Sequence, residues 1–169
     1  KRGPIEILIN NSSGPKGGAL LDAKPEEFTE AFAQHLLTNH FLAQKLVPGM
    51  KAKGYGRIIN IISTSVYAPI ANLGVSNTTR GAVASWAKTL SNEVAAGGIT
   101  DNSVLPGYTN TERLKALIAG TAQRLGKTEA QVIEDWKNAT PARRFAEPEE
   151  VAASIGFLAS PAASFITGV

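Results

Sequence analysis

The sequence predicts an α/β fold built on a parallel β-sheet. Three short segments of strand-like character alternate along the chain with longer segments of helical periodicity. Those at 5–9 and 57–62 are apolar, and the one at 99–105 is a weaker strand signal because Asp101 lies inside it. This alternation is typical of parallel strands joined by helices, and such connections are right-handed crossovers. With 169 residues, the chain is long enough for one domain with a hydrophobic core.

The first strand and the helix after it have clear boundaries in the sequence. Residues 5–9 (IEILI) form a short apolar run that ends at Asn10 and Asn11, as expected of a buried parallel strand. A loop rich in Ser, Gly and Pro follows. A helix then begins at Pro25 with acidic residues in its first turn, and its apolar periodicity continues to about Lys53.

The segment from Arg57 to Leu90 is the most informative part of the chain. Residues 57–62 predict a strand that is buried on both faces apart from Asn60, and Ser63 follows at its end. Ser76 and Arg80 open the next helix, one turn apart on the same face. A hydroxyl at a strand end that faces a hydroxyl and a cation on a helix can polarise a carbonyl oxygen.

The last third of the chain predicts one more strand and several helices. The strand at 99–105 contains Asp101 and is closed by Pro106-Gly107. Residues 113–138 predict two or three short helices, broken at Gly120 and Gly126. A final helix is expected at 147–159, and another strand is expected to start at 167–169.

The predicted strands all end in polar or glycine-rich residues, namely Asn10-Asn11, Ser63 and Pro106-Gly107. Ligands of parallel α/β sheets bind beyond the carboxyl ends of the strands, so these ends together predict a ligand site. Residues of these types also make ordinary turns, which is the simpler explanation for any one strand end taken alone.

Composition excludes several classes of function. The net charge of +3 is spread without a run of Lys or Arg, which argues against nucleic-acid binding. There is no cysteine, and the spacing of His35 and His40 is not that of a helical metal pair, so no metal site is expected. No apolar run reaches the roughly 18 residues of a membrane span, and we expect a cytoplasmic protein.

Motifs of a known family occur along the whole chain in the family's order. They are LINNSS at 8–13, RIINIIS at 57–63, LPGYTNT at 105–111, RFAEPEEVA at 144–152, and the stretch 157–168. With these motifs the chain resembles the short-chain dehydrogenase/reductase family, nearest the 3-oxoacyl-acyl-carrier-protein reductase type. Each motif is weak by itself, but their order and separations make the resemblance specific.

The resemblance implies a Rossmann-type, doubly wound parallel sheet in three α/β/α layers, lacking its N-terminal strands and its last strand in this chain. Residues 1–169 would form a single partial domain, in which 109–144 is a substrate-covering helical segment. The family binds NAD or NADP, although the chain has no G-x-G-x-x-G turn for the cofactor phosphates. The positions that match cofactor-binding motifs are Asn10, Asn11, Ser12, Arg80, Pro106, Gly107, Thr109 and Thr111.

The resemblance also implies which residues are catalytic. The family uses a serine, a tyrosine, a lysine one turn after the tyrosine, and an asparagine on the long helix. These positions fall on Ser63, Ser76, Arg80 and His35, so three of the four are altered. Arginine keeps the positive charge but cannot shuttle a proton, and serine is a far weaker acid than tyrosine.

Two further side chains have open roles. His35 could titrate near neutrality and replace the family's water relay, or it could be a packing residue. Tyr67, the tyrosine nearest to Ser63 in sequence, could reach the substrate or could form part of an ordinary wall. Apolar residues of the covering segment could line a pocket or only pack its helices together, and these are Leu114, Leu117, Ile118, Val132 and Trp136.

Two functions follow from these expectations. The first is an NAD(P)-dependent oxidoreductase that interconverts a carbonyl and a secondary alcohol of a small molecule by hydride transfer. The alternative is a non-catalytic relative that binds the cofactor or forms oligomers. The resemblance implies a homodimer or homotetramer that pairs through the helices at 26–53 and 76–94.

Overall fold

Three parallel strands lie at the centre of the first of the two units into which the chain divides. The structure, a computed structural model, describes residues 3–169. The first unit consists of the chain up to Leu105 together with Ser154–Val169, and the second consists of Pro106–Ala153.

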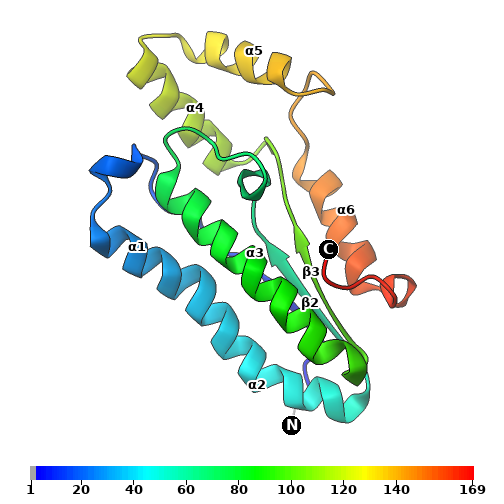
Figure 1. Ribbon diagram of the computed structural model, residues 1–169. Helices are drawn as coiled ribbons and strands as arrows, with labels where there is room; N and C mark the ends of the chain where they lie inside the picture. The colour runs from blue at the N-terminus through cyan, green and yellow to red at the C-terminus, as the bar shows by residue number, and fades with distance from the viewer. Residues whose placement is uncertain (1–2) are drawn as a thin grey trace. The chain divides into compact units, whose positions relative to one another are not determined.

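The sheet has the strand order β1-β2-β3, with β1 at Ile7–Asn10, β2 at Gly56–Ile61 and β3 at Ile99–Val104. All neighbouring strands are parallel, as predicted, and Asn10 of β1 is paired with Asn60 of β2. The carboxyl ends of the strands therefore lie along one edge of the sheet (Figure 1).

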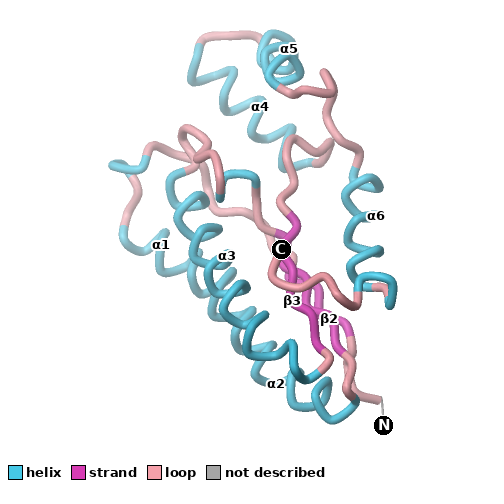
Figure 2. The backbone as a smooth tube through the Cα atoms, turned by 45° about the vertical axis from the view of Figure 1, so that its right-hand side comes forward, coloured by secondary structure: helices cyan, strands magenta, loops and turns pink. Residues whose placement is uncertain are grey.

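The long helical segment of the first unit lies with α3 on one face of the sheet (Figures 1 and 2). This segment runs from α1 (Pro25–Phe32) through a π-helical turn (Ala33–Leu37) into α2 (Thr38–Lys53), and α3 spans Gly74–Val94. The prediction of one helical segment from Pro25 to about Lys53 is thus confirmed. Leu8, Met50, Ile58, Val94 and Ile99 form the buried apolar core between these helices and the sheet.

The opposite face is covered by the part of α6 from Ser154 onward and by the chain that follows it. Ile59 of β2 packs there against Leu158 and Ala163. The last residues then run beside β3, because Gly168 N–H donates to the Asp101 carbonyl over 2.7 Å and Ser103 N–H donates to the Val169 carbonyl over 2.6 Å. This unit therefore has helix, sheet and helix layers, as the resemblance implies.

Polar side chains form a buried line across all three strands. Asn10 Nδ2 donates to Asn60 Oδ1 over 2.8 Å, and Asn60 Nδ2 donates to Asp101 Oδ1 over 2.7 Å. The expectation that Asn60 is an exception to burial is wrong, since both Asn60 and Asp101 are 0% exposed. Their hydrogen bonds to each other offset the cost of burying them.

The second unit is a small helical layer built on α4 (Glu112–Leu125) and α5 (Glu129–Ala139). The predicted break at Gly126 is confirmed, with this residue in the left-handed conformation at φ 63°. The predicted break at Gly120 is wrong. One glycine costs a helix only about 1 kcal/mol, and Leu114, Ile118 and Ala122 on either side of it pack against Val132 of α5.

The remaining elements are short or cross between the units. Helix α6 spans Pro148–Ala159, close to the predicted bounds. Single 3₁₀ turns occur at Leu20–Asp22, Thr64–Val66, Ala95–Gly97 and Pro161–Ala163. Within residues 3–169, none of the helices combines the length and apolar character needed to cross a membrane.

We predict that Asn60→Ala lowers the free energy of unfolding by about 2–3 kcal/mol, because it leaves the Asn10 amide and the Asp101 carboxyl buried without their shared partner. Urea unfolding measures the difference. The matched control is Asn92→Ala on the exposed face of α3, which should change the value by less than about 0.5 kcal/mol. Equal effects of the two substitutions would show that the buried line of side chains is not stabilising.

Candidate functional site

Ser63 follows β2 directly and lies at the carboxyl end of the sheet. Its backbone remains extended at φ −167°, and its Oγ accepts a hydrogen bond from Ser65 N–H over 3.1 Å, which caps the Thr64–Val66 turn. This bond uses one acceptor position of the hydroxyl and leaves its hydrogen available for donation. The side chain is half-buried, so the cap fixes it without enclosing it.

Ser76 and Arg80 occupy the first turns of α3 on its buried side. Each is 9% exposed. Arg80 Nη1 donates to the carbonyl of Ile61 over 2.8 Å, and Ile61 lies two residues before Ser63. This bond holds the guanidinium at the end of β2, as the shared helical face of Ser76 and Arg80 predicts.

His35 lies in the π-helical turn, 1% exposed, and its Nδ1 is 2.7 Å from Ser12 Oγ in the loop after β1. Burial and the positive charge of Arg80 lower the pKa of His35 to about 4. The expectation that His35 titrates near neutrality is therefore wrong: the ring is neutral at pH 7 because an imidazolium would be both desolvated and repelled.

The structure thus joins the loop after β1, the end of β2, the long helix and α3 through a short series of interactions. Ser12 contacts His35, the charge of Arg80 acts on His35, and Arg80 holds the strand end next to Ser63. Asn10 Nδ2 donates a hydrogen bond to Asn60 within the sheet, and Asn10 Oδ1 is buried without a protein partner. Asn11 is exposed beyond it.

The other predicted cofactor residues lie in the second unit, of which Pro106 and Gly107 are the first residues. Thr111 caps α4 by accepting from Leu114 N–H over 3.4 Å, and Thr109 Oγ1 donates to the Gly107 carbonyl over 3.2 Å. These contacts shape the loop that follows β3.

The apolar residues of the covering segment pack its helices together. Leu114, Ile118 and Val132 are buried against one another, and Trp136 and Phe145 pack at their edge. Tyr108 stacks on Trp136 with ring centroids 4.7 Å apart and an interplanar angle of 11°. This aromatic contact was not predicted from the sequence, because the two residues lie far apart along the chain and outside any common periodic pattern.

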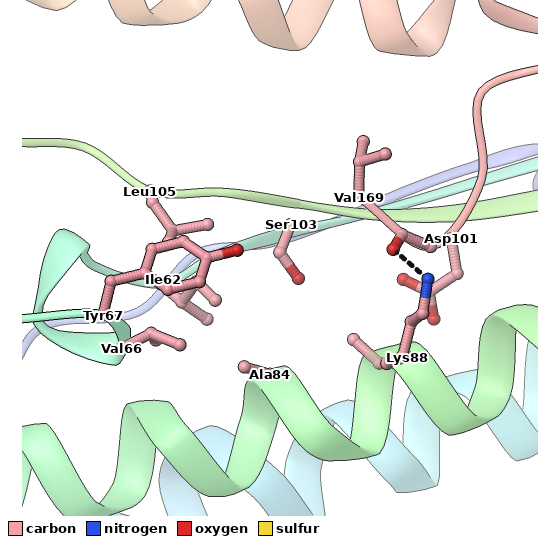
Figure 3. A pocket seen from close by; sticks show the side chains of 11 residues that line it. Ile62, Val66, Tyr67, Ala84, Lys88, Asp101, Ser103, Leu105 and Val169 are labelled. Atoms are coloured by element: carbon pink, nitrogen blue, oxygen red, sulfur yellow. Dashed lines mark hydrogen bonds between the residues drawn. The ribbon is translucent and has the colours of Figure 1, made fainter.

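Tyr67 lines a cavity of about 320 Å³ between α3 and β3. Figure 3 shows its ring directed toward Ser103 and Leu105, with Ala84 and Lys88 of α3 opposite. Ser63, Ser76 and Arg80 are not among the residues that line this cavity. Tyr67 is 86% exposed although it lines this cavity.

Asp101 also borders this cavity, near the point where Lys88 Nζ donates to the Gly168 carbonyl over 2.7 Å (Figure 3). Burial raises the pKa of Asp101 to about 8, although the hydrogen bond from Asn60 acts in the opposite direction. The role of Asp101 as a buried titratable group was not predicted. Its position within a predicted strand was the available signal.

Comparison with known proteins identifies the family. A family model described as enoyl-(acyl carrier protein) reductase matches residues 1–169. The chain belongs to this family of short-chain dehydrogenases/reductases. Membership agrees with the parallel sheet and with the motifs at its strand ends.

Among curated relatives of this reductase-family chain, the 3-oxoacyl-(acyl-carrier-protein) reductase FabG of Vibrio cholerae is 36% identical over 168 residues, 98% of the chain and 64% of the relative. The acetoacetyl-CoA reductase of Rhizobium meliloti is 33% identical over 168 residues, which are 98% of this chain and 65% of the relative. The chain therefore spans a little under two thirds of the length of these relatives.

Solved structures match the fold over nearly the whole chain. YwfH, an NADPH-dependent reductase involved in bacilysin biosynthesis, has a TM-score of 0.91 at 28% identity and is matched over 98% of this chain and 63% of its own. The L-sorbose reductase of Gluconobacter frateurii, complexed with NADPH and L-sorbose, has a TM-score of 0.89 at 29% identity, with the same coverages of 98% and 63%.

The two shifted pKa values predict a pH profile of stability. Folded Asp101 keeps its proton up to about pH 8, whereas an unfolded aspartic acid loses it near pH 4. The unfolded chain therefore binds fewer protons in that range, and the free energy of unfolding falls as pH rises, by about 1.4 kcal/mol per unit. His35 acts oppositely between about pH 6.5 and 4, since there the unfolded chain binds more protons.

The effects of Asp101 and His35 on the free energy of unfolding cancel between about pH 4 and 6.5. Above pH 6.5 only the loss of stability from Asp101 remains. We predict that Asp101→Asn, which keeps the acceptor for Asn60, abolishes the loss of stability between pH 6.5 and 8 and reveals the loss from His35 below pH 6.5. Urea unfolding at constant ionic strength measures both limbs. An unchanged slope above pH 6.5 in the variant would contradict the assignment to Asp101.

Proposed function

We propose that this protein is an NAD(P)-dependent oxidoreductase that interconverts a carbonyl group and a secondary alcohol by hydride transfer. The observation that carries the proposal is the hydrogen bond that holds the Arg80 guanidinium on the Ile61 carbonyl, at the end of the strand that Ser63 follows. A cation and a hydroxyl at the carboxyl end of a parallel sheet can stabilise negative charge on a carbonyl oxygen. Relatives described as NADPH-dependent or 3-oxoacyl reductases support this chemistry.

The described residues fit the nicotinamide half of NAD or NADP. Among residues 3–169, Asn10 Oδ1 is a buried polar atom without a hydrogen-bond partner, and it belongs to the last residue of β1. Such atoms commonly mark a place for water or a ligand. Asn11, Ser12 and Arg80 would bind hydroxyl groups of the nucleotide there. By the resemblance, Pro106, Gly107, Thr109 and Thr111 of the second unit match the family's nicotinamide-binding motif. When bound, the reduced cofactor supplies the hydride.

The site differs from the family pattern in its source of protons. By the resemblance, Ser76 stands at the position of the tyrosine acid, Arg80 at that of the lysine and His35 at that of the asparagine. Ser63, Ser76 and Arg80 would then stabilise the oxygen by hydrogen bonds and charge, and solvent water would deliver the proton. The neutral, buried His35 is a weak acid and a weak base, so it fits a positioning role better than proton exchange.

A non-catalytic function is the second candidate. It is favoured by the replacement of the family's tyrosine and lysine and by the exposed apolar surface of the long helix. Leu37 and Phe41 are large apolar residues of this segment, 58% and 55% exposed. A non-catalytic relative would keep the cofactor site and use the helices at 26–53 and 76–94 to form a homodimer or homotetramer. Measurement of the mass in solution tests the oligomer, which is compatible with either function.

We predict that the purified protein oxidises NADPH or NADH in the presence of a ketone or a 3-oxoacyl thioester, and that Ser63→Ala lowers kcat/KM about 10²-fold through loss of one donor to the reacting oxygen. Absorbance at the nicotinamide band measures turnover. Ser85→Ala, on the exposed side of α3, is the control and should leave the rate unchanged. Cofactor binding without turnover on any substrate would instead support the non-catalytic function.

The double substitution Ser76→Tyr with Arg80→Lys should raise kcat by 10²–10⁴-fold, because it restores a tuned acid next to a cation that can exchange protons. Steady-state kinetics measure the gain, and Ser76→Phe with Arg80→Lys, which lacks the hydroxyl, is the matched control. An equal response of the two variants would show that Ser76 does not lie at the reacting oxygen.

A further inference from the structure

The loop after β1 is fastened to the long helix by two adjacent serine hydroxyls. Ser12 Oγ lies 2.7 Å from His35 Nδ1, and Ser13 Oγ accepts from Gln34 Nε2 over 3.1 Å. The two bonds differ in their surroundings, since His35 is 1% exposed whereas the contact of Ser13 with Gln34 is at the surface. Ser12 therefore makes an interior contact with the long helix, and Ser13 makes a surface contact with the same helix.

The helix is distorted at the point where it receives Ser12. Residues Ala33–Leu37 form a π-helical turn between α1 and α2, with His35 at its centre. Such turns cost regular hydrogen bonding and occur frequently at functional sites. Here the distortion lies at His35, which contacts Ser12 and is close enough to Arg80 to be affected by its charge.

The hydrogen-bonding state of His35 determines what Ser12 can do. The neutral ring carries its proton on Nδ1 or on Nε2. In the second form a buried N–H would be left unpaired, because Nε2 has no partner among the residues that the structure describes. Buried N–H groups without partners are rarer than buried acceptors without partners. The Nδ1–H form is therefore favoured, with His35 donating to Ser12 Oγ.

A serine that accepts from His35 still has its own hydrogen to donate. Ser12 is half-buried, two residues beyond the last residue of β1, where ligands of parallel sheets bind. We propose that Ser12 is a hydrogen-bond donor to an oxygen atom of the bound ligand, and that His35 is the positioning residue that orients it. The proposal rests on the proposed function, and the acceptor is a ribose hydroxyl of the nicotinamide nucleotide or the carbonyl oxygen of the substrate.

The test compares Ser12→Ala with Ser13→Ala, which removes the neighbouring hydroxyl from the same loop. One measurement is the Kd for NADPH without substrate, by titration of the cofactor fluorescence, and the other is kcat and KM for a ketone at saturating NADPH. We expect Ser12→Ala either to raise the Kd for NADPH or to lower kcat/KM for the ketone by about five- to tenfold, which corresponds to the loss of one hydrogen bond. Ser13→Ala should leave both quantities unchanged. A change in the Kd assigns the acceptor to the nucleotide, and a change confined to the ketone kinetics assigns it to the substrate.

Substitution of His35 separates positioning from a structural role. His35→Gln keeps an N–H donor and should retain much of the affinity or rate, whereas His35→Leu should reproduce the loss seen in Ser12→Ala. Urea unfolding of each variant identifies any that fail to fold. If His35→Leu fails to fold, the comparison of Ser12→Ala with Ser13→Ala still tests the role of Ser12.

Wild-type protein that binds no cofactor and turns over no substrate would overturn the proposed function together with this inference. An active wild type with an unaltered Ser12→Ala variant, or with equal losses in both serine variants, would overturn this inference alone.

Discussion

The hydrogen bonds that Asn60 makes to both neighbouring strands are the interaction on which the rest of the structure depends. Its amide connects Asn10 of β1 to Asp101 of β3 within the buried sheet. Because the polar groups satisfy one another only when the three strands are in this register, a slip would leave a carboxyl group and two amides buried without partners. The register in turn places the ends of β1 and β2 side by side, and the candidate site is built from those ends.

The site is assembled by contacts between segments that are distant in sequence. Arg80 is held by a main-chain carbonyl of β2, and Ser12 is held by a buried histidine of the long helix. Under the proposed function, Arg80 and Ser12 would donate hydrogen bonds at the carboxyl end of the sheet, where a carbonyl oxygen would gain negative charge during reduction. A site of this composition stabilises charge but has no tuned acid among the side chains assigned to it, which is consistent with protonation by water.

Most of the fold was predictable from the sequence, because it depends on local patterns. Short apolar runs predict β1 and β2, a weaker segment closed by Pro106-Gly107 predicts β3, and helical periodicity predicts the segment from Pro25 to Lys53. The errors arose where tertiary packing outweighed a local signal. Helix α4 continues through Gly120 because the apolar residues around it pack against α5, and Asn60 is buried because Asn10 and Asp101 supply its partners.

The candidate site was predictable in its residues but less so in its electrostatics. Ser63, Ser76 and Arg80 were predicted from motif positions and helical spacing, and the structure holds Arg80 on the strand that Ser63 follows. The low pKa of His35 and the high pKa of Asp101 could not be predicted, since both result from burial produced by distant segments. The contact between Ser12 and His35 likewise has no signature in the sequence, because a loop and a helix 23 residues away supply its two halves.

The most direct test of the central claim, that this site performs hydride transfer to a carbonyl, is to follow the hydrogen itself. NADPH deuterated at C4 of the nicotinamide is incubated with the protein and a prochiral ketone, and the alcohol product is analysed by mass spectrometry and chiral chromatography. Hydride transfer at this site should place one deuterium on the carbinol carbon and give one enantiomer of the alcohol. Alcohol that contains no deuterium, or that is racemic, would contradict it.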